Sequence, residues 1–305
     1  AIHCDGLLDL EYHLRRLREQ QPEGYPESRY SSLVADPRTP RIARSPNEIT
    51  MVGKSYFQFG DGSAPGSGAS HGSVTATGEE TIRIEANCLH APLSPNLLAR
   101  AAEYTDDKTV KEMQDAVQDG THRRLGSTIH DGVGIAILRT SGVPERAAAG
   151  IAYGDTLHHR HRDLLDVQLF AYERPFLTDL GYPQSWASMS KWESHWATHN
   201  AAWGALEPSL GGNAGRGHLI RTLFSDGVQI LDVAADRWLW DEGRERWYKP
   251  GVTFRRLLGL VETDGEGVVL IDFSRVTGGI DHWRICRGLE GNFASDNTGL
   301  VSRSG

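Results

Sequence analysis

The sequence predicts an α+β multidomain protein, with a helical part over residues 1–125 and an antiparallel β-sandwich over residues 126–305. Apolar side chains in the first part recur at helical spacing, whereas short apolar or alternating runs follow one another from about residue 127. Turn-forming residues separate these runs, and no helical pattern lies between them. This arrangement favours an antiparallel sandwich over a sheet with crossover helices.

Three segments of the first part carry a helical pattern. Residues 7–17 trace an apolar stripe with arginines on the opposite side. A second helix begins near Pro95, a residue well suited to the first helical position, and a third covers residues 108–118. Residues 21–90 are rich in Pro, Ser and Gly, so we interpret them as a long irregular segment that is functional or wraps around a neighbouring element.

The second part contains six clear strand patterns. Each combines β-branched, aromatic or alternating apolar residues with turn residues at its ends. The expected strands are residues 133–139, 167–172, 228–233, 238–240, 253–258 and 268–273.

Composition and the chain ends narrow the possible partners. The formal charge is −8 and the mean hydropathy is −0.43, so we expect no general attraction to nucleic acid and no membrane insertion. An acidic substrate would have to be bound by local clusters of Arg and His. Three widely spaced cysteines show no disulfide framework and no metal-binding pair. Because the chain starts without Met or a signal-peptide pattern and stops after turn residues, we expect a fragment cut at both ends.

Histidines cluster in the middle of the sequence. His159 and His161 would project to the same face of an extended segment, and Asp179 and His199 follow. Imidazole nitrogens and a carboxylate oxygen are ligands that Zn²⁺ accepts, and three of them would leave one position for water. Histidines in strands are also commonly solvated or hydrogen-bonded, so spacing alone leaves both interpretations open.

A resemblance to a known family favours the zinc interpretation. The run His159–Asp163, the strand that follows it, and Asp179–Gly181 resemble the His-x-His-x-Asp and Asp-x-Gly signature of the heparinase II/III-like polysaccharide lyases. Thr198–Asn200 is similar to the family's His-Asn element. Residues 131–139 resemble the strand that opens its sandwich, and residues 59–62 resemble the loop before its last toroid helices.

The resemblance implies a fold and a reaction. The helical part would be the C-terminal end of an (α/α) toroid, followed by an antiparallel β-sandwich that is itself truncated. The cleft between them would bind a uronic-acid polysaccharide, such as a glycosaminoglycan or alginate. Cleavage would proceed by β-elimination, which removes the C5 proton of a uronate and leaves an unsaturated product. The family further implies a secreted or periplasmic bacterial location.

The resemblance also assigns roles to residues. His159 matches the catalytic histidine, and Tyr12, on a helix that faintly resembles the family's tyrosine helix, would protonate the leaving oxygen. The zinc ligands would be His161, Asp179 and His199, with the metal largely structural. Asn200 and Arg160 are candidate substrate-binding residues, and Asp163 is a candidate to orient an imidazole.

Several alternatives stay open at this point. Asp163 is as well explained by hydrogen bonding at the end of a strand, and Arg160 and Arg162 by outward salt bridges. A non-catalytic carbohydrate-binding sandwich that keeps the zinc, or a hydrolase in which zinc-bound water attacks the glycan, would use the same ligands. Oligomeric state and the particular polymer are not specified by the sequence.

Overall fold

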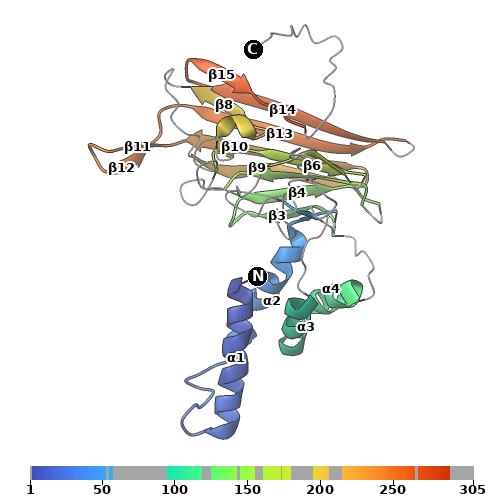
Figure 1. Cartoon of the computed structure of the whole chain (residues 1–305), viewed down its shortest axis with the longest axis vertical. Helices are drawn as coiled ribbons and strands as arrows, with labels where there is room; N and C mark the ends of the chain where they lie inside the picture. Colours follow the sequence, from blue (N-terminus) through green and yellow to red (C-terminus); the bar gives the residue numbers. More distant parts are fainter. Residues whose placement is uncertain are drawn as a thin grey trace, which may run out of the picture.

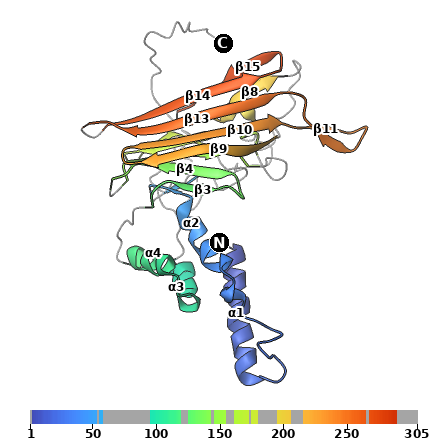
Figure 2. The same ribbon diagram turned by 180° about the vertical axis from the view of Figure 1, so that it is seen from behind.

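The computed structural model describes residues 2–52, 55–57, 95–118, 125–142, 145–154, 161–172, 174–179, 195–205, 215–264 and 267–288, and the description of the fold is confined to them. Two large antiparallel sheets lie face to face, with the helical part below them in Figures 1 and 2. None of the helices in these ranges is long and apolar enough to cross a membrane.

The helical part is built from short elements around a small core. Its elements are α1 (Ile2–Gln20), the 3-10 helix η1 (Leu33–Ala35), α2 (Arg38–Glu48), α3 (Pro95–Tyr104) and α4 (Lys108–Gln118). The three helices expected from the sequence are confirmed as α1, α3 and α4. They enclose a cluster of buried side chains made of Leu8, Val34, Ala43, Ala101, Val110 and Met113.

The expectation that residues 21–90 lack regular structure is wrong for α2. Pro40 is the third residue of this helix, a position where its missing N–H costs no helical hydrogen bond. Ala43 is 1% exposed and joins the helical core. Arg44 lies 3.4 Å from both Glu48 and Asp107, so it links α2 to the segment before α4. Tertiary contacts therefore support a helix that local composition does not predict.

The first large sheet has the strand order β3-β4-β5-β6-β7, and all of its pairs are antiparallel. Its strands are β3 (Thr128–His130), β4 (Ile135–Arg139), β5 (Ala147–Ala152), β6 (Val167–Ala171) and β7 (Arg174–Leu177). The expected strands at 133–139 and 167–172 are thus confirmed within two residues at their ends.

The second large sheet has the order β14-β13-β10-β9 and is also antiparallel. Its strands are β9 (Gly215–Ser225), β10 (Val228–Arg237), β13 (Thr253–Glu262) and β14 (Val268–Thr277). Gly227, with a φ of 75°, makes the tight turn between β9 and β10. β9 was not predicted from the sequence. It lies at the edge of the sheet, and a bulge opposite Asp232 and Val233 interrupts the alternation of its residues.

The core lies between these two sheets. Leu138 and Ile151 from the first sheet and Leu231 and Leu258 from the second belong to one cluster of fully buried side chains. Because inward and outward residues alternate along each strand, one face of each sheet contributes to this core. The expected antiparallel sandwich is therefore confirmed.

The outer face of the first sheet is covered by the segment that follows α2. This segment contains the short strands β1 (Thr50–Met51) and β2 (Ser55–Tyr56). Phe57 is 2% exposed and joins a cluster on β4 to β6. The buried Arg139 donates hydrogen bonds to the carbonyl oxygens of Glu48 and Thr50, each 2.6 Å from its Nη2. These contacts tie the end of α2 to the sandwich.

Two small sheets extend from the sandwich. β8 (Ala202–Ala205) pairs with β15 (Asp281–Arg284) beside β14, and the 3-10 helix η4 (Trp196–Thr198) precedes β8. β11 (Leu239–Asp241) and β12 (Arg246–Tyr248) form a hairpin that projects from the body of the sandwich in both views. β11 covers the strand expected at residues 238–240.

Candidate metal centre

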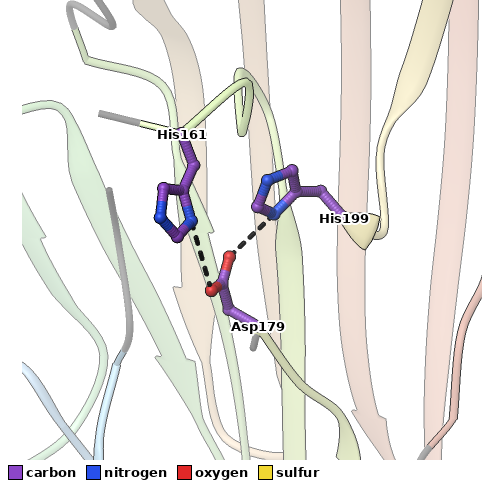
Figure 3. A group of neighbouring side chains, drawn as sticks. All are labelled: His161, Asp179 and His199. Carbon is purple, nitrogen blue, oxygen red and sulfur yellow. Dashed lines mark hydrogen bonds and ion pairs between the residues drawn. The ribbon is translucent and has the colours of Figure 1, made fainter. Parts of the chain in front are cut away.

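Three segments of the sandwich bring His161, Asp179 and His199 together (Figure 3). His161 lies in the turn before β6, Asp179 follows β7, and His199 follows η4. The Nδ1 of His199 is 2.8 Å from Oδ2 of Asp179, and the Nδ1 of His161 is 3.8 Å from Oδ1 of the same carboxylate. One ligand atom from each residue lies within 4.8 Å of the others.

Strand pairing and two backbone contacts produce this arrangement. β6 and β7 form an antiparallel hairpin, so the residues before β6 and after β7 lie at the same end of the sheet. The segment of His199 is held against β6 because the Asn200 N–H donates to Oδ1 of Asp166 at 2.5 Å. The N–H of Val167 in turn donates to the Asn200 carbonyl at 3.2 Å.

The three side chains are almost completely removed from solvent. His161 is 2% exposed, Asp179 is 1% exposed and His199 is 0% exposed. A carboxylate at such a depth is unstable without a positive partner. The centre therefore requires a cation or a protonated imidazole in contact with Asp179.

Electrostatic interactions inside the centre shift its pKa values strongly. Burial by itself would raise the pKa of Asp179, but the imidazole of His199, followed by that of His161, outweighs burial and holds this pKa well below its usual range. Burial would lower the pKa of His199, whereas the facing carboxylate of Asp179 raises it to about 9. Burial and the charge of Asp179 raise the pKa of Asp166 to about 7. A bound metal ion would replace the His199 proton as the positive partner of Asp179.

The unsatisfied atoms of the centre fit a metal ion. Within the described residues, both ring nitrogens of His161 and the Nε2 of His199 are buried without a hydrogen-bond partner. Two imidazoles and one carboxylate are a common ligand set for zinc, with ligand atoms about 2.0–2.2 Å from the ion and hence roughly 3.3–3.5 Å from one another. The observed separations of 2.8 and 3.8 Å lie on either side of that range. This buried group could therefore hold a metal ion.

Two arginines and one aspartate brace the centre, although sequence reasoning did not single them out. Arg256 from β13 donates to the carbonyls of Leu165 and Asn200, and it pairs with Asp272 at 2.6 Å. The N–H of Arg287 donates to the Oδ1 of Asn200 at 2.6 Å. The aspartate is Asp166, whose Oδ1 accepts the N–H of Asn200. These braces join segments far apart in the chain, so no local pattern marks them.

The other residues expected at the site are placed as follows. His159 and Arg160 lie outside the described residues. Tyr12 is on α1, is 47% exposed, and contacts His13 and Arg16 in the helical part rather than the metal centre. Asn200 is fully buried, and its side chain bridges the Thr178 carbonyl and the Arg287 N–H.

Asp163, expected either to orient an imidazole or to bond at a strand end, is also buried. It is 3% exposed, and its charge contributes to the raised pKa of His199. Its backbone carbonyl accepts the N–H of Asp166 in the turn before β6. Asp163 therefore belongs to the electrostatic surroundings of the centre.

Solved structures share this fold. The chain is similar to heparinase III, with a TM-score of 0.54 and 16% identity, over 88% of this chain and 38% of that one. It is also similar to a heparan sulfate lyase from Pedobacter heparinus, with a TM-score of 0.46 and 13% identity, over 85% of this chain and 38% of the other. The expected resemblance to heparinases is thus confirmed at the level of the fold. The chain spans about two fifths of the length of these structures.

No protein-family sequence model and no curated protein sequence matches the chain. The class defined by fold and site is therefore an antiparallel β-sandwich of heparinase III type that carries a buried His-Asp-His group able to hold a metal ion.

Proposed function

We propose that this chain is part of a polysaccharide lyase that cleaves a uronic-acid-containing polysaccharide by β-elimination. One observation carries the proposal: the buried group of His161, Asp179 and His199 lies on a sandwich with the heparinase III fold. The solved structures named above are a heparinase and a heparan sulfate lyase, which supports an acidic glycan as the substrate class.

We further propose that zinc occupies the group and has a largely structural role. The nitrogen and oxygen ligands and their unsatisfied ring atoms support zinc, and their burial supports a metal enclosed by protein rather than one facing substrate. When bound, zinc would supply coordinate bonds that join the segments of His161, Asp179 and His199. This would fix the residues on either side of each ligand, including His159 and Arg162.

The proposed reaction needs a base, a group that neutralises the uronate, and an acid. The base removes the C5 proton, the C5–H electron pair forms the C4=C5 double bond, and the C4–O bond breaks. The acid protonates the departing oxygen. Donors aimed at the carboxylate stabilise the charge that develops during proton removal. We assign His159 to proton abstraction or neutralisation, Tyr12 to the acid and Arg160 to substrate binding. Asn200, expected from the sequence to bind substrate, is fully buried, so we assign it instead to holding the segment of His199 in place.

The proposal extends to organisation and location. Residues 1–125 would be the end of an (α/α) toroid with a long loop and residues 126–305 its β-sandwich, with the substrate cleft between them. The whole protein would act in the bacterial periplasm or outside the cell. For the 305-residue chain alone, the alternatives are a carbohydrate-binding sandwich without catalysis and a metal-dependent hydrolase.

Ultraviolet absorbance tests the reaction class, because elimination creates a conjugated unsaturated uronate and hydrolysis does not. Heparan-type, chondroitin-type, alginate and glucuronan polymers would be incubated with the chain. We expect absorbance to rise with at least one of them. Cleavage products without this absorbance would support hydrolysis, whereas binding without cleavage would support the carbohydrate-binding module.

Metal analysis tests the division of roles. We expect His161→Ala to lose bound zinc and thermal stability, and His159→Ala to keep both while losing turnover. His218→Ala is the matched control, because His218 is an exposed histidine on β9, and it should retain metal and stability. Equal zinc loss in the His159 and His161 variants would contradict a separate role for His159.

A further inference from the structure

Three tryptophans form an aromatic group next to the metal centre. Trp203 on β8 and Trp283 on β15 are directly opposite each other across the strand pair. The indole of Trp196, in η4, stacks on Trp203 with ring centroids 4.5 Å apart and an angle of 10° between the planes. Its centroid is 6.1 Å from that of Trp283. Segments about 80 residues apart in the chain thus build one aromatic group.

The members of this group differ sharply in exposure. Trp203 is 3% exposed, whereas Trp283 is 54% exposed. The exposed indole is therefore supported by buried or half-buried partners that fix its position. A rigid aromatic face in contact with solvent can bind a ligand at little cost in conformational entropy. The apolar face of a sugar ring is one surface that fits it.

Cationic and polar side chains adjoin the aromatic group. Burial is the main cause that lowers the pKa of His195 and of Arg237, and the nearby charge of Arg162 lowers both further. The ring of His195 contacts Trp196, with centroids 5.1 Å apart. Its Nδ1 accepts the N–H of Ala197, which leaves Nε2 as the nitrogen available to a ligand. Arg237 lies over the ring of Trp203. Arg237 is buried, so Arg162 and His195 are the groups beside the tryptophans that can meet an acidic ligand.

The metal centre would hold this surface in place. Arg162 directly follows His161, and Trp196 precedes His199 by three residues. The candidate ligand His161 is thus next to the cationic Arg162, and the candidate ligand His199 is close in sequence to the aromatic Trp196. The positive charge of Arg162 favours an acidic ligand on this surface, and the neighbouring metal centre would keep the surface in a fixed shape.

We propose that Arg162, His195, Trp196 and Trp283, here called the sugar strip, bind a uronate residue of the glycan substrate. The pyranose ring stacks on Trp283, while Arg162 and His195 bind the carboxylate or a sulfate group. This inference rests on the proposed lyase function and specifies where that function recognises its substrate. Neither Trp283 nor His195 takes part in the elimination itself.

Binding measurements on the full chain test the strip. Glucuronan and heparan-type oligosaccharides would be titrated calorimetrically, with a neutral cellulose-type oligosaccharide as the uncharged probe. We expect Trp283→Ala to weaken binding of the acidic oligosaccharides about tenfold, the size of one lost aromatic stacking contact with its buried area. Trp240→Ala is the matched control, because Trp240 is 48% exposed on the projecting β11–β12 hairpin, and it should leave binding unchanged.

A second variant tests the charge without altering the aromatic group. Arg162→Gln should weaken acidic oligosaccharides, reduce the salt dependence of their binding, and leave zinc content unchanged. Unchanged affinity in Trp283→Ala, equal loss in Trp240→Ala, or equal affinity for neutral and acidic probes would overturn the proposal. So would failure of the unmodified chain to bind any acidic probe. The absorbance assay scores the lyase reaction separately, so elimination at sub-saturating substrate that is unchanged by Trp283→Ala would refute the strip alone.

Discussion

Arg256 offers a sharp test of how the sandwich supports the metal centre. Its side chain is 1% exposed and lies on the inner side of β13, between the second sheet and the turn before β6. It forms a fork with the carboxylate of Asp272 at 2.8 and 2.6 Å, and it donates to two buried carbonyls. Replacing it by Ala would leave those carbonyls, at Leu165 and Asn200, without this donor.

The expected cost follows from these contacts. The Asn200 carbonyl keeps the N–H of Val167, so only the loss of the donor at the Leu165 carbonyl counts in full, at ~1–3 kcal/mol. Breaking a buried ion pair costs ~3–5 kcal/mol in total after the arginine's own desolvation is counted. Asp272 keeps Arg284 as a partner, which limits the loss. We therefore expect Arg256→Ala to lower the free energy of unfolding by about 3–5 kcal/mol, or roughly 6–20 °C in melting temperature.

The neighbouring residue provides the control. Arg255 points to the opposite face of β13, is 50% exposed, and pairs with Asp232, which also contacts Arg221. Its replacement by Ala should cost less than that of Arg256, about 1–2 kcal/mol, because Arg255 is half exposed and the buried Asp232 keeps Arg221 as a partner. Thermal unfolding followed by circular dichroism, together with zinc analysis, measures both variants. Similar small shifts in the two variants, with zinc retained in both, would refute the view that Arg256 braces the centre.

Two further predictions concern the helical part and the outer face of the sandwich. The side chain of Glu11 is fully buried, and burial by itself would raise its pKa. Hydrogen bonds from the Leu33 N–H, Arg15 and Ser32 outweigh burial, so the pKa of Glu11 is lowered. A lowered folded-state pKa stabilises the fold above the unfolded value of 4.5, and this contribution disappears as pH falls through the lowered value. Urea unfolding at pH near 6 and near 3.5 should therefore show a smaller pH effect for Glu11→Gln than for the original chain, and an identical slope would contradict this role. Gly150→Ala should destabilise by ~1–3 kcal/mol, because an added Cβ would lie 2.3 Å from the Phe57 ring. Gly132→Ala, with no atom within 4 Å of the added Cβ, should be close to neutral in the same melts.

Local patterns predicted six strands, including interior strands of both large sheets, but neither their partners nor strands such as β5 and β9. The alternating residues of β10, β13 and β14 predict strands because each presents one face to the core, whereas β6 is buried on both faces. The same rule fails for β9, since ten of its eleven residues are at least partly exposed and its register shifts at a bulge. α2 was missed because its prolines and serines are unfavourable locally, while contacts with α3 and α4 support it.

The sequence by itself determined the chemistry available at the centre. Imidazoles at His161 and His199 and a carboxylate at Asp179 are zinc-compatible ligands, and His161 lies shortly before the strand expected at residues 167–172. Only the tertiary structure decided that these groups are buried within 4.8 Å of one another and braced by Arg256 and Arg287.

The same division applies to the surface beside the centre. The sequence contains Trp196, Trp203 and Trp283 but gives no reason to group the last with the first two. Pairing of β8 with β15 brings them together, and burial then leaves one indole exposed. Residue type is local, whereas burial, pKa and contact between distant segments arise when the chain folds. The possible ligands could therefore be predicted from the sequence, and their environment could not.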